Sequence, residues 1–223
     1  MLVKPNEQHM DSRPTCSVDE VKQMQQELSF KVEYTDPSWI DTTKIAGIDI
    51  AYSGQTASTC VAVLRASDLA LLRTENMTSE VDYPYVPGLL ALREAPLMSK
   101  ILQGMNLKCP VLVDGNGVLH PRGFGLACSV GFGLGITTIG VAKKLLLGEV
   151  GLRERDIAPI THEGRTVGAA VWLGNSSKPV YVSVGHKISL PTAVKVVIQS
   201  SWSRNPEPLR QAHMKARAHL AVA

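Results

Sequence analysis

Short apolar runs bounded by turn residues occupy the chain between residues 44 and 78. They cover residues 44–52, 58–66 and 69–78, and Ser-Gly-Gln and Ser-Asp turns separate them. Runs of this length between turn signals are typical of strands, and short turns favour antiparallel pairing. The pattern therefore predicts a three-stranded antiparallel meander.

Helices and strands alternate after the proline-rich break at residues 84–88. The predicted elements are a helix over 89–105 that Pro96 kinks or restarts, a strand at 110–114, a glycine-rich helix at roughly 124–134, strands at 137–142, 166–174 and 179–185, and helices at 190–205 and 209–220. A proline inside a helix removes one backbone hydrogen bond, so an interruption is expected at Pro96. A meander followed by alternating helices and strands indicates an α/β sandwich with a mixed sheet.

The N-terminal part of the chain differs from the rest. Residues 1–17 are expected to be disordered, and Val18–Tyr34 is expected to form a helix, because Ser17 and Glu20 form a capping-box pattern. We interpret residues 1–40 as an N-terminal extension with one helix, and residues 41–223 as a single catalytic domain.

Composition narrows the class of protein. The chain has 223 residues, of which 44% are apolar and 19% charged, and no apolar run approaches the roughly 20 residues needed to span a bilayer. The four cysteines are scattered without a Cys-x-x-Cys spacing, which argues against a zinc knuckle or a disulfide framework. A monomer without a membrane anchor, located in the cytoplasm or nucleus, is expected.

Positive charge gathers towards the C-terminus. Residues 186–223 hold six Lys or Arg against one Glu, whereas residues 1–41 hold four against eight acids. A polyanionic partner fits this bias, although a mild charge bias more often reflects a solvated helix face.

Three acids stand out as candidates for chemistry. Asp49 lies between isoleucines in the first strand, Asp114 ends the strand at 110–114, and Glu94 opens a helix. Carboxylates from separate elements could converge on Mg²⁺ or Mn²⁺, which prefer oxygen ligands. Each acid alone has a simpler explanation: Asp49 could cap a turn, Glu94 could pair with Arg93, and Asp114 could open an Asx-turn.

Strand ends carry further candidates. Lys143 and Lys144 follow the strand at 137–142, and His186 with Lys187 ends the strand at 179–185 in the same way. We expect both pairs near the carboxyl edge of the sheet, where ligands of open α/β sheets gather. A lysine there can hold a phosphate as a point charge, although surface solubility explains most lysines.

Six motifs follow one another along the chain: GIDIAY, PYVPGLLALRE, VLVDGNGVLHPRGFG, GVAKKLL, VYVSVGHKISL and PEPLRQAH. Together they resemble the endonuclease V family, from about residue 44 to the C-terminus. The resemblance implies a ribonuclease H-like fold, a three-layer sandwich with a mixed sheet of five or more strands between helices. It also implies an Mg²⁺-dependent enzyme, with Mn²⁺ as substitute, that cleaves the second phosphodiester 3′ to inosine and leaves 3′-hydroxyl and 5′-phosphate ends.

The resemblance also implies roles for residues. The metal-binding set is Asp49, Glu94, Asp114 and His213, where His213 could be a ligand, a water positioner or a general acid-base group. Lys143 is expected to stabilise developing charge, and His120 to contact the scissile strand. A wedge that fills the gap left by the extracted base would comprise Pro84, Tyr85, Val86 and Pro87. An inosine pocket built largely from main chain would comprise Gly88, Leu90, Gly115, Gly125 and Leu126.

Single-stranded RNA containing inosine is the expected substrate. The sequences VLHPRGFG and GVAKKLL look closest to the animal branch of the family, whose members act mainly on such RNA. Deoxyinosine DNA is the alternative, as is a catalytically weak inosine-binding module. A sugar-kinase or actin-like nucleotide domain also begins with an aspartate on its opening strand, but that fold usually needs two such domains.

Overall fold

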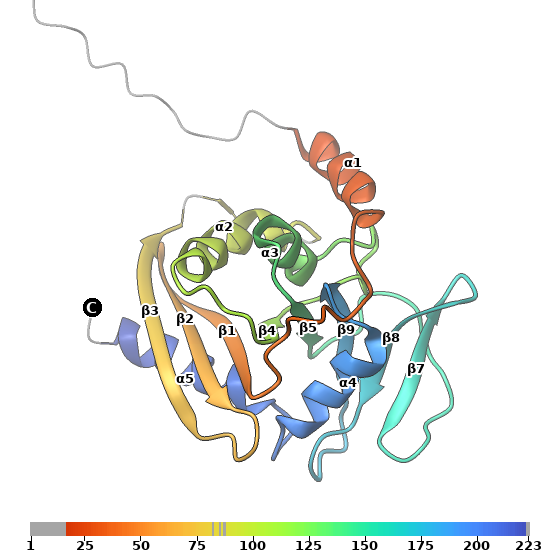
Figure 1. Cartoon of the computed structure of the whole chain (residues 1–223). Coiled ribbons are helices and arrows are strands. Elements are labelled where there is room, and N and C mark those ends of the chain that lie inside the picture. Colours follow the sequence, from red (N-terminus) through yellow and green to blue (C-terminus); the bar gives the residue numbers. More distant parts are fainter. Residues whose placement is uncertain (1–16, 82, 85, 87, 222–223) are drawn as a thin grey trace, which may run out of the picture.

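The computed structural model describes residues 17–81, 83, 84, 86 and 88–221. The described part of the chain forms five helices and nine strands. Figure 1 shows their arrangement. The elements are α1 (Val18–Ser29), β1 (Lys44–Ser53), β2 (Thr56–Arg65), β3 (Leu71–Glu80), α2 (Leu90–Gln103), β4 (Val111–Asp114), α3 (Leu126–Leu134), β5 (Thr138–Ala142), β6 (Glu149–Val150), β7 (Ile157–His162), β8 (Arg165–Val171), β9 (Val180–His186), α4 (Leu190–Gln199) and α5 (Glu207–Leu220).

All nine described strands belong to one mixed sheet, in the order β3-β2-β1-β4-β5-β9-β8-β7-β6. The predicted meander is confirmed, because β1 pairs antiparallel with β2 and β2 with β3. The centre of the sheet is parallel, since β4 joins β1 and β5 in the same direction. The carboxyl ends of these three strands therefore meet at one edge, where the acids are expected.

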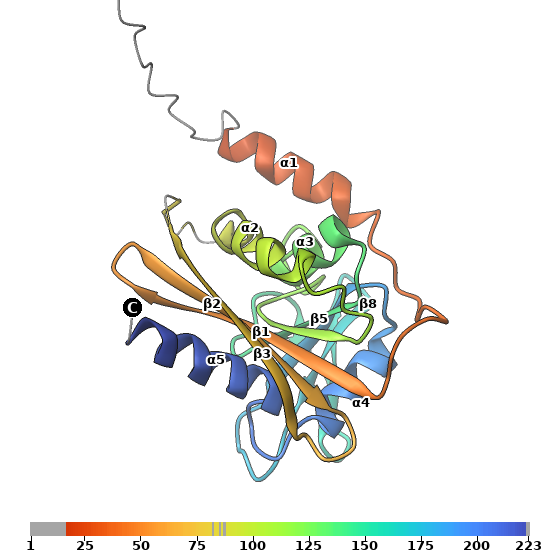
Figure 2. The ribbon, with the colours of Figure 1, turned by 60° about the vertical axis from the view of Figure 1, so that its left-hand side comes forward.

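Helices cover both faces of the sheet (Figures 1 and 2), with α2 and α3 on one face and α4 and α5 on the other. Alternation along β1 sends Ile48 and Ile50 towards α2 and α3, and Ile45 towards the core shared with α4 and α5. Helix α5 approaches β1 so closely that a Cβ on Gly47 would overlap the backbone of Pro208. Only glycine permits this contact, which fixes where α5 crosses the strand.

Several predicted boundaries were wrong. Helix α2 runs without interruption through Pro96, so the predicted restart there does not occur. The first helix ends at Ser29 rather than Tyr34, and α4 ends at Gln199 rather than 205. Strand β7 was not predicted, because its apolar residues Ala158 and Ile160 flank Pro159, and a proline in a short run argues against a strand.

Helix α1 begins with the predicted capping box, in which Glu20 N–H donates to Ser17 Oγ and Ser17 N–H donates to the Glu20 carboxylate. The helix does not stand free, because Leu28 and, beyond its end, Val32 pack against the central apolar core. The division of the chain at residue 40 stays a prediction. No helix in the described part of the chain is long and apolar enough to cross a membrane.

Candidate active site

Asp49 and Asp114 lie side by side on neighbouring parallel strands. Ile48 of β1 is in register with Val113 of β4, so the two acids follow at the next position of each strand. Both point to the face that α5 covers, opposite to Ile48 and Val113, which belong to the cluster under α2 and α3. The strand pairing therefore brings together two of the predicted metal-binding acids.

Glu94 reaches the same edge from the other face of the sheet, on the first turn and a half of α2. Its carboxylate accepts a hydrogen bond from the Tyr52 hydroxyl at 2.9 Å. Tyr52 is close enough to Arg93 for the guanidinium to lie 4.5 Å from the ring centroid. Tyr52 follows the alternation of β1, which turns it to the α2 face while Asp49 turns to the α5 face.

The three acids share one electrostatic environment. Burial, followed by the negative charges of Asp49 and Asp114, raises the pKa of Glu94 to about 7, although the Tyr52 hydrogen bond opposes the rise. Burial and the charge of Asp114 likewise raise the pKa of Asp49, against the effect of His213. A site that disfavours its own negative charges stabilises a bound cation.

Each carboxylate also has its own partner in the structure. His213 Nδ1 lies 2.7 Å from Asp49 Oδ2, and Lys143 Nζ lies 2.7 Å from Asp114 Oδ2, while Tyr52 holds Glu94. Among the described residues, no three His, Cys, Asp or Glu side chains form a group that could enclose a metal ion as they stand. The donor chemistry fits Mg²⁺ or Mn²⁺, but the carboxylates are paired with protein groups rather than gathered around one point.

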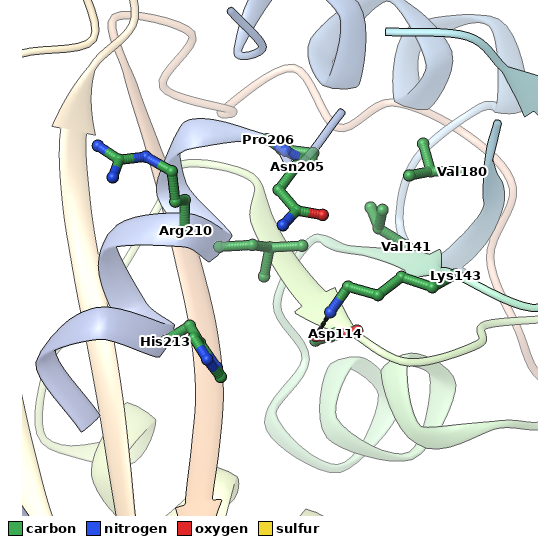
Figure 3. A pocket seen from close by; sticks show the side chains of 9 residues that line it. Asp114, Val141, Lys143, Val180, Asn205, Pro206, Arg210 and His213 are labelled. Atoms are coloured by element: carbon green, nitrogen blue, oxygen red, sulfur yellow. Dashed lines mark hydrogen bonds and ion pairs between the residues drawn. The ribbon is translucent and has the colours of Figure 1, made fainter. Parts of the chain in front are cut away.

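A small cavity of about 100 Å³ opens between Asp114, Lys143 and His213 (Figure 3). Asn205, just before α5, and Arg210, in the first turn of α5, also line this cavity. Arg210 is already held by two hydrogen bonds to the buried carboxylate of Glu207, both at 2.6 Å. Sequence reasoning singled out neither Asn205 nor Arg210, because polar residues beside prolines give no signal of their own.

The predicted pocket residues around α3 come together. Gly125 N–H donates to Gly117 O at 3.0 Å, and a Cβ on Gly115 would lie 3.0 Å from the Leu126 side chain. Leu126 and Leu90 belong to the same apolar cluster. The turn after Asp114 and the start of α3 therefore form one wall with little room for side chains.

Gly88 is joined to this wall through His120 and Arg122. The Gly88 carbonyl oxygen lies 3.2 Å from His120 Nε2 and accepts a hydrogen bond from the Arg122 guanidinium. His120 is buried, and burial together with the Arg122 charge lowers its pKa to about 4. The predicted contact of His120 with the scissile strand stays a prediction; in the structure the ring supports the Gly88 turn.

The predicted wedge is described only in part. Pro84 is exposed and Val86 half-buried, and Val86 O accepts a hydrogen bond from Leu89 N–H at 2.9 Å. Tyr85 and Pro87 lie outside the described residues. The carbonyl of Tyr83, just before the wedge, accepts a hydrogen bond from Arg93 at 2.7 Å, which ties this segment to α2.

His186 and Lys187 do not join the acids, so that expectation was wrong. Strand β9 runs antiparallel to β5, and His186 pairs with Thr138 at the start of β5. The pair therefore lies at the sheet edge opposite Lys143, where His186 contacts Glu33. Strand direction, which the sequence did not reveal, decides this point.

Comparison with known proteins identifies the family. The family model of endonuclease V matches residues 25–214. The chain belongs to the endonuclease V family. The endonuclease V of Thermofilum pendens is 43% identical over 179 residues, which is 79% of this chain and 77% of that protein.

Solved endonuclease V structures share the fold. The crystal structure of human ENDOV is 31% identical with a TM-score of 0.80, covering 92% of this chain and 98% of that one. Endonuclease V of Ciona intestinalis, crystallised with a 24mer DNA containing an inosine followed by a ribo-adenosine, is 29% identical with a TM-score of 0.83, covering 92% and 97%. The expected ribonuclease H-like fold, with helices on both faces of a mixed sheet, is thereby confirmed.

One contact of this endonuclease V site escaped the sequence reasoning. Tyr52 lies within the GIDIAY motif, three residues after Asp49, but nothing in the pattern indicated that its hydroxyl would reach Glu94, 42 residues away. The alternation of β1 could have assigned Tyr52 to the face opposite Asp49. The position of α2 over that face comes only from the structure.

Proposed function

We propose that this endonuclease V is a Mg²⁺-dependent enzyme that cleaves the second phosphodiester 3′ to inosine, preferentially in single-stranded RNA, and leaves 3′-hydroxyl and 5′-phosphate ends. The observation that carries the proposal is that Asp49, Glu94 and Asp114 lie at the edge where β1 and β4 end, close enough for the charges of Asp49 and Asp114 to raise the pKa of Glu94. A nuclease that must bring a phosphate to three acids needs a cation between them, because like charges repel.

Asp49, Glu94 and Asp114 are the residues that would hold the ion, with His213 at the rim. Bound there, Mg²⁺ supplies a Lewis acid for the phosphoryl oxygens and a water of lowered pKa. Mn²⁺ would substitute, because it accepts the same oxygen donors.

Lys143 would stabilise the charge that grows on the phosphate. Its ammonium group is half-exposed and already lies 2.7 Å from Asp114. A lysine is a mobile point charge on a flexible stem, so it can turn from the carboxylate to a phosphate oxygen without backbone movement.

His213 would position a water molecule or move a proton. An ionised Asp49 accepts hydrogen bonds but donates none, so His213 Nδ1 must carry the hydrogen of their 2.7 Å contact. The opposite ring nitrogen, Nε2, is then free of that bond on a side chain that is about half exposed. This arrangement suits proton transfer at the rim of the site.

The wall formed by Gly88, Gly115, Gly125 and Leu126 would select the base. Hypoxanthine lacks the exocyclic amine that guanine and adenine carry, so a close main-chain pocket excludes both by steric overlap and unpaired polar groups. The base must leave its stack to be examined in this way, which is easiest in a single strand.

The ribonucleotide preference draws support from the Ciona intestinalis complex, whose ligand carries a ribo-adenosine after the inosine. Two strands of identical sequence would test it, each with one inosine and with either a ribose or a deoxyribose as its 3′ neighbour. We expect faster cleavage of the ribose strand and no cleavage in excess chelator. The 3′-hydroxyl end of the product should lie on the nucleotide that follows the inosine. A preference for the all-DNA strand would favour the deoxyinosine alternative, and binding without cleavage in Mg²⁺ would favour the binding-module alternative.

A further inference from the structure

Helix α1 carries a buried glutamine whose side-chain nitrogen and oxygen both form hydrogen bonds inside the protein. Gln25 is 6% exposed, although it lies on a helix whose outer face is polar and exposed. Its Nε2 donates to Phe124 O at 3.1 Å, and its Oε1 accepts from Arg122 Nε at 2.7 Å. A buried side-chain amide with both ends satisfied fixes the positions of the groups that it joins.

Arg122 passes this restraint on to Gly88. While Nε binds Gln25, the guanidinium Nη2 donates to the Gly88 carbonyl oxygen. His120 Nδ1 accepts from Arg122 N–H at 3.3 Å, so its Nε2 carries the ring hydrogen and donates to that same Gly88 oxygen. Two donors therefore hold one carbonyl, and Gln25 orients the stronger of them.

The two contacts to the Gly88 carbonyl oxygen hold a backbone turn that only glycine adopts readily. The φ of +76° at Gly88 is in the left-handed region, and the next residue, Leu89, is the N-cap of α2. A side chain here would come within 3.2 Å of the Arg122 guanidinium. The restraint on Gly88 thus sets where α2 begins relative to the wall at Gly125.

A second contact of α1 reaches the same segment. A Cβ on Gly123, whose φ is +64°, would lie 3.2 Å from Ser29 Cβ at the end of α1. Helix α1 therefore packs directly on the turn between His120 and Phe124. The N-terminal helix is thus linked to the Gly88 turn through Gln25 and Arg122.

We propose that Gln25 is a positioning residue for base selection, acting through Arg122 on the Gly88 carbonyl. The inference rests on the proposed function, because it takes the wall at Gly88 and Gly125 as the surface that receives inosine. A pocket that rejects one additional amine discriminates only while its main chain stays in place, and small displacements are costly at such sites.

The test compares three variants in the full-length protein. Gln25→Met fills the same volume without either hydrogen bond, Gln25→Glu keeps the acceptor for Arg122, and Gln26→Met changes the exposed neighbour on α1. Cleavage of otherwise identical RNA strands with inosine or adenosine is measured, together with Mn²⁺ binding by calorimetry and thermal unfolding.

For Gln25→Met we expect about a tenfold rise in KM for the inosine strand and a similar loss of preference over adenosine. The kcat at saturating RNA and the Mn²⁺ affinity should stay unchanged, and Gln26→Met should resemble the wild type. Gln25→Glu, which keeps the acceptor for Arg122 but loses the donor to Phe124 O, should lose less than Gln25→Met. If Gln25→Met does not fold, Arg122→Gln breaks the same link and should give the same tenfold effect.

An unchanged KM and preference in folded Gln25→Met would overturn the inference, as would an equal loss in Gln25→Glu. A fall in kcat with KM unchanged would also overturn it, because the glutamine would then act on the reacting groups. Wild-type protein that cleaves both strands equally would instead overturn the proposed function, so the two failures are distinct.

Discussion

Two regions of the site are built on opposite physical grounds. The carboxylate edge, which comprises Asp49, Glu94, Asp114, Lys143 and His213, is partly exposed and electrostatically strained. The glycine wall, which comprises Gly88, Gly115, Gly125 and Leu126 with His120 and Arg122 behind it, is largely buried and held by main-chain hydrogen bonds. The carboxylate edge would bind a ligand by neutralising its negative charges, whereas the glycine wall would bind one by matching its shape.

The two regions also respond to pH in opposite directions. Glu94 has a pKa of about 7 in the folded state, against an ordinary value of 4.5. Between these two values only the unfolded chain loses the proton, so the free energy of unfolding falls as pH rises. His120 has a lowered pKa of about 4, so its protonation in the unfolded chain weakens the folded state as pH falls below 6.5.

The largest expected effect comes from removing one acid of the carboxylate edge. Asp49→Ala or Asp114→Ala should lower Mg²⁺-dependent cleavage on the order of 10³-fold, because each would remove one of the proposed ligands of the ion. Binding of an inosine strand without metal should be retained or improved, since one repelling charge is gone. Glu80→Ala, which removes an exposed carboxylate from β3, is the control. Wild-type cleavage that persists in excess chelator would refute the metal mechanism.

Replacing Lys143 should have the next largest effect. Lys143→Ala should lower kcat about 10²-fold, as removal of one group that stabilises transition-state charge typically does. Lys144→Ala removes an equally exposed ammonium group from the next position, and we expect a change of less than about threefold. Equal losses in single-turnover assays of both variants would mean that the lysines only attract the strand.

His120 gives the glycine wall its own pH dependence. A folded pKa of about 4 against 6.5 in the unfolded chain means that stability rises with pH across this window, by up to about 3 kcal/mol. Urea unfolding of wild type and His120→Gln at pH 5 and pH 7 would measure it. We expect the substitution to cost less at pH 5 than at pH 7. The half-exposed His162→Gln is the control, and an equal cost of His120→Gln at both pH values would count against the neutral buried ring.

The smallest expected effect concerns Tyr52. Tyr52→Phe removes only the hydroxyl that donates to Glu94 at 2.9 Å, which should weaken the apparent Mg²⁺ affinity about tenfold and leave kcat at saturating metal unchanged. Tyr34→Phe, on the segment after α1, is the matched control. Cleavage measured over a Mg²⁺ titration would decide, and superimposable curves for Tyr52→Phe and wild type would leave Tyr52 without a positioning role.

The sequence predicted the meander and the central strands because local signals define them. Apolar runs, turn residues and the Ser17–Glu20 capping box each act within a few positions. Strand β7 was missed because Pro159 contradicts the local rule, and Pro96 was expected to break a helix that its packing under β1 and β2 maintains. Tertiary contacts outweigh propensity in both cases.

The site divides in the same way. Motif resemblance pointed to Asp49, Glu94, Asp114, Lys143 and His213, and the structure brings all of them to one edge of the sheet. Tyr52 and Gln25 were not predicted, because each acts through a partner distant in sequence: Glu94 lies 42 positions after Tyr52, and Arg122 lies 97 positions after Gln25. The placement of His186 failed because strand direction sets which end of β9 meets the acids.

The close crossing of α5 over Gly47 has a consequence for synthesis of the chain. His213 comes 164 residues after Asp49, so the ribosome must add all of them before the two side chains can meet. At roughly 5–20 residues per second this takes about 8–33 s. Until α5 has been made, β1 lacks the helix that covers it, and Asp49 lacks the histidine that contacts it. This part of the candidate site is therefore completed only at the end of synthesis.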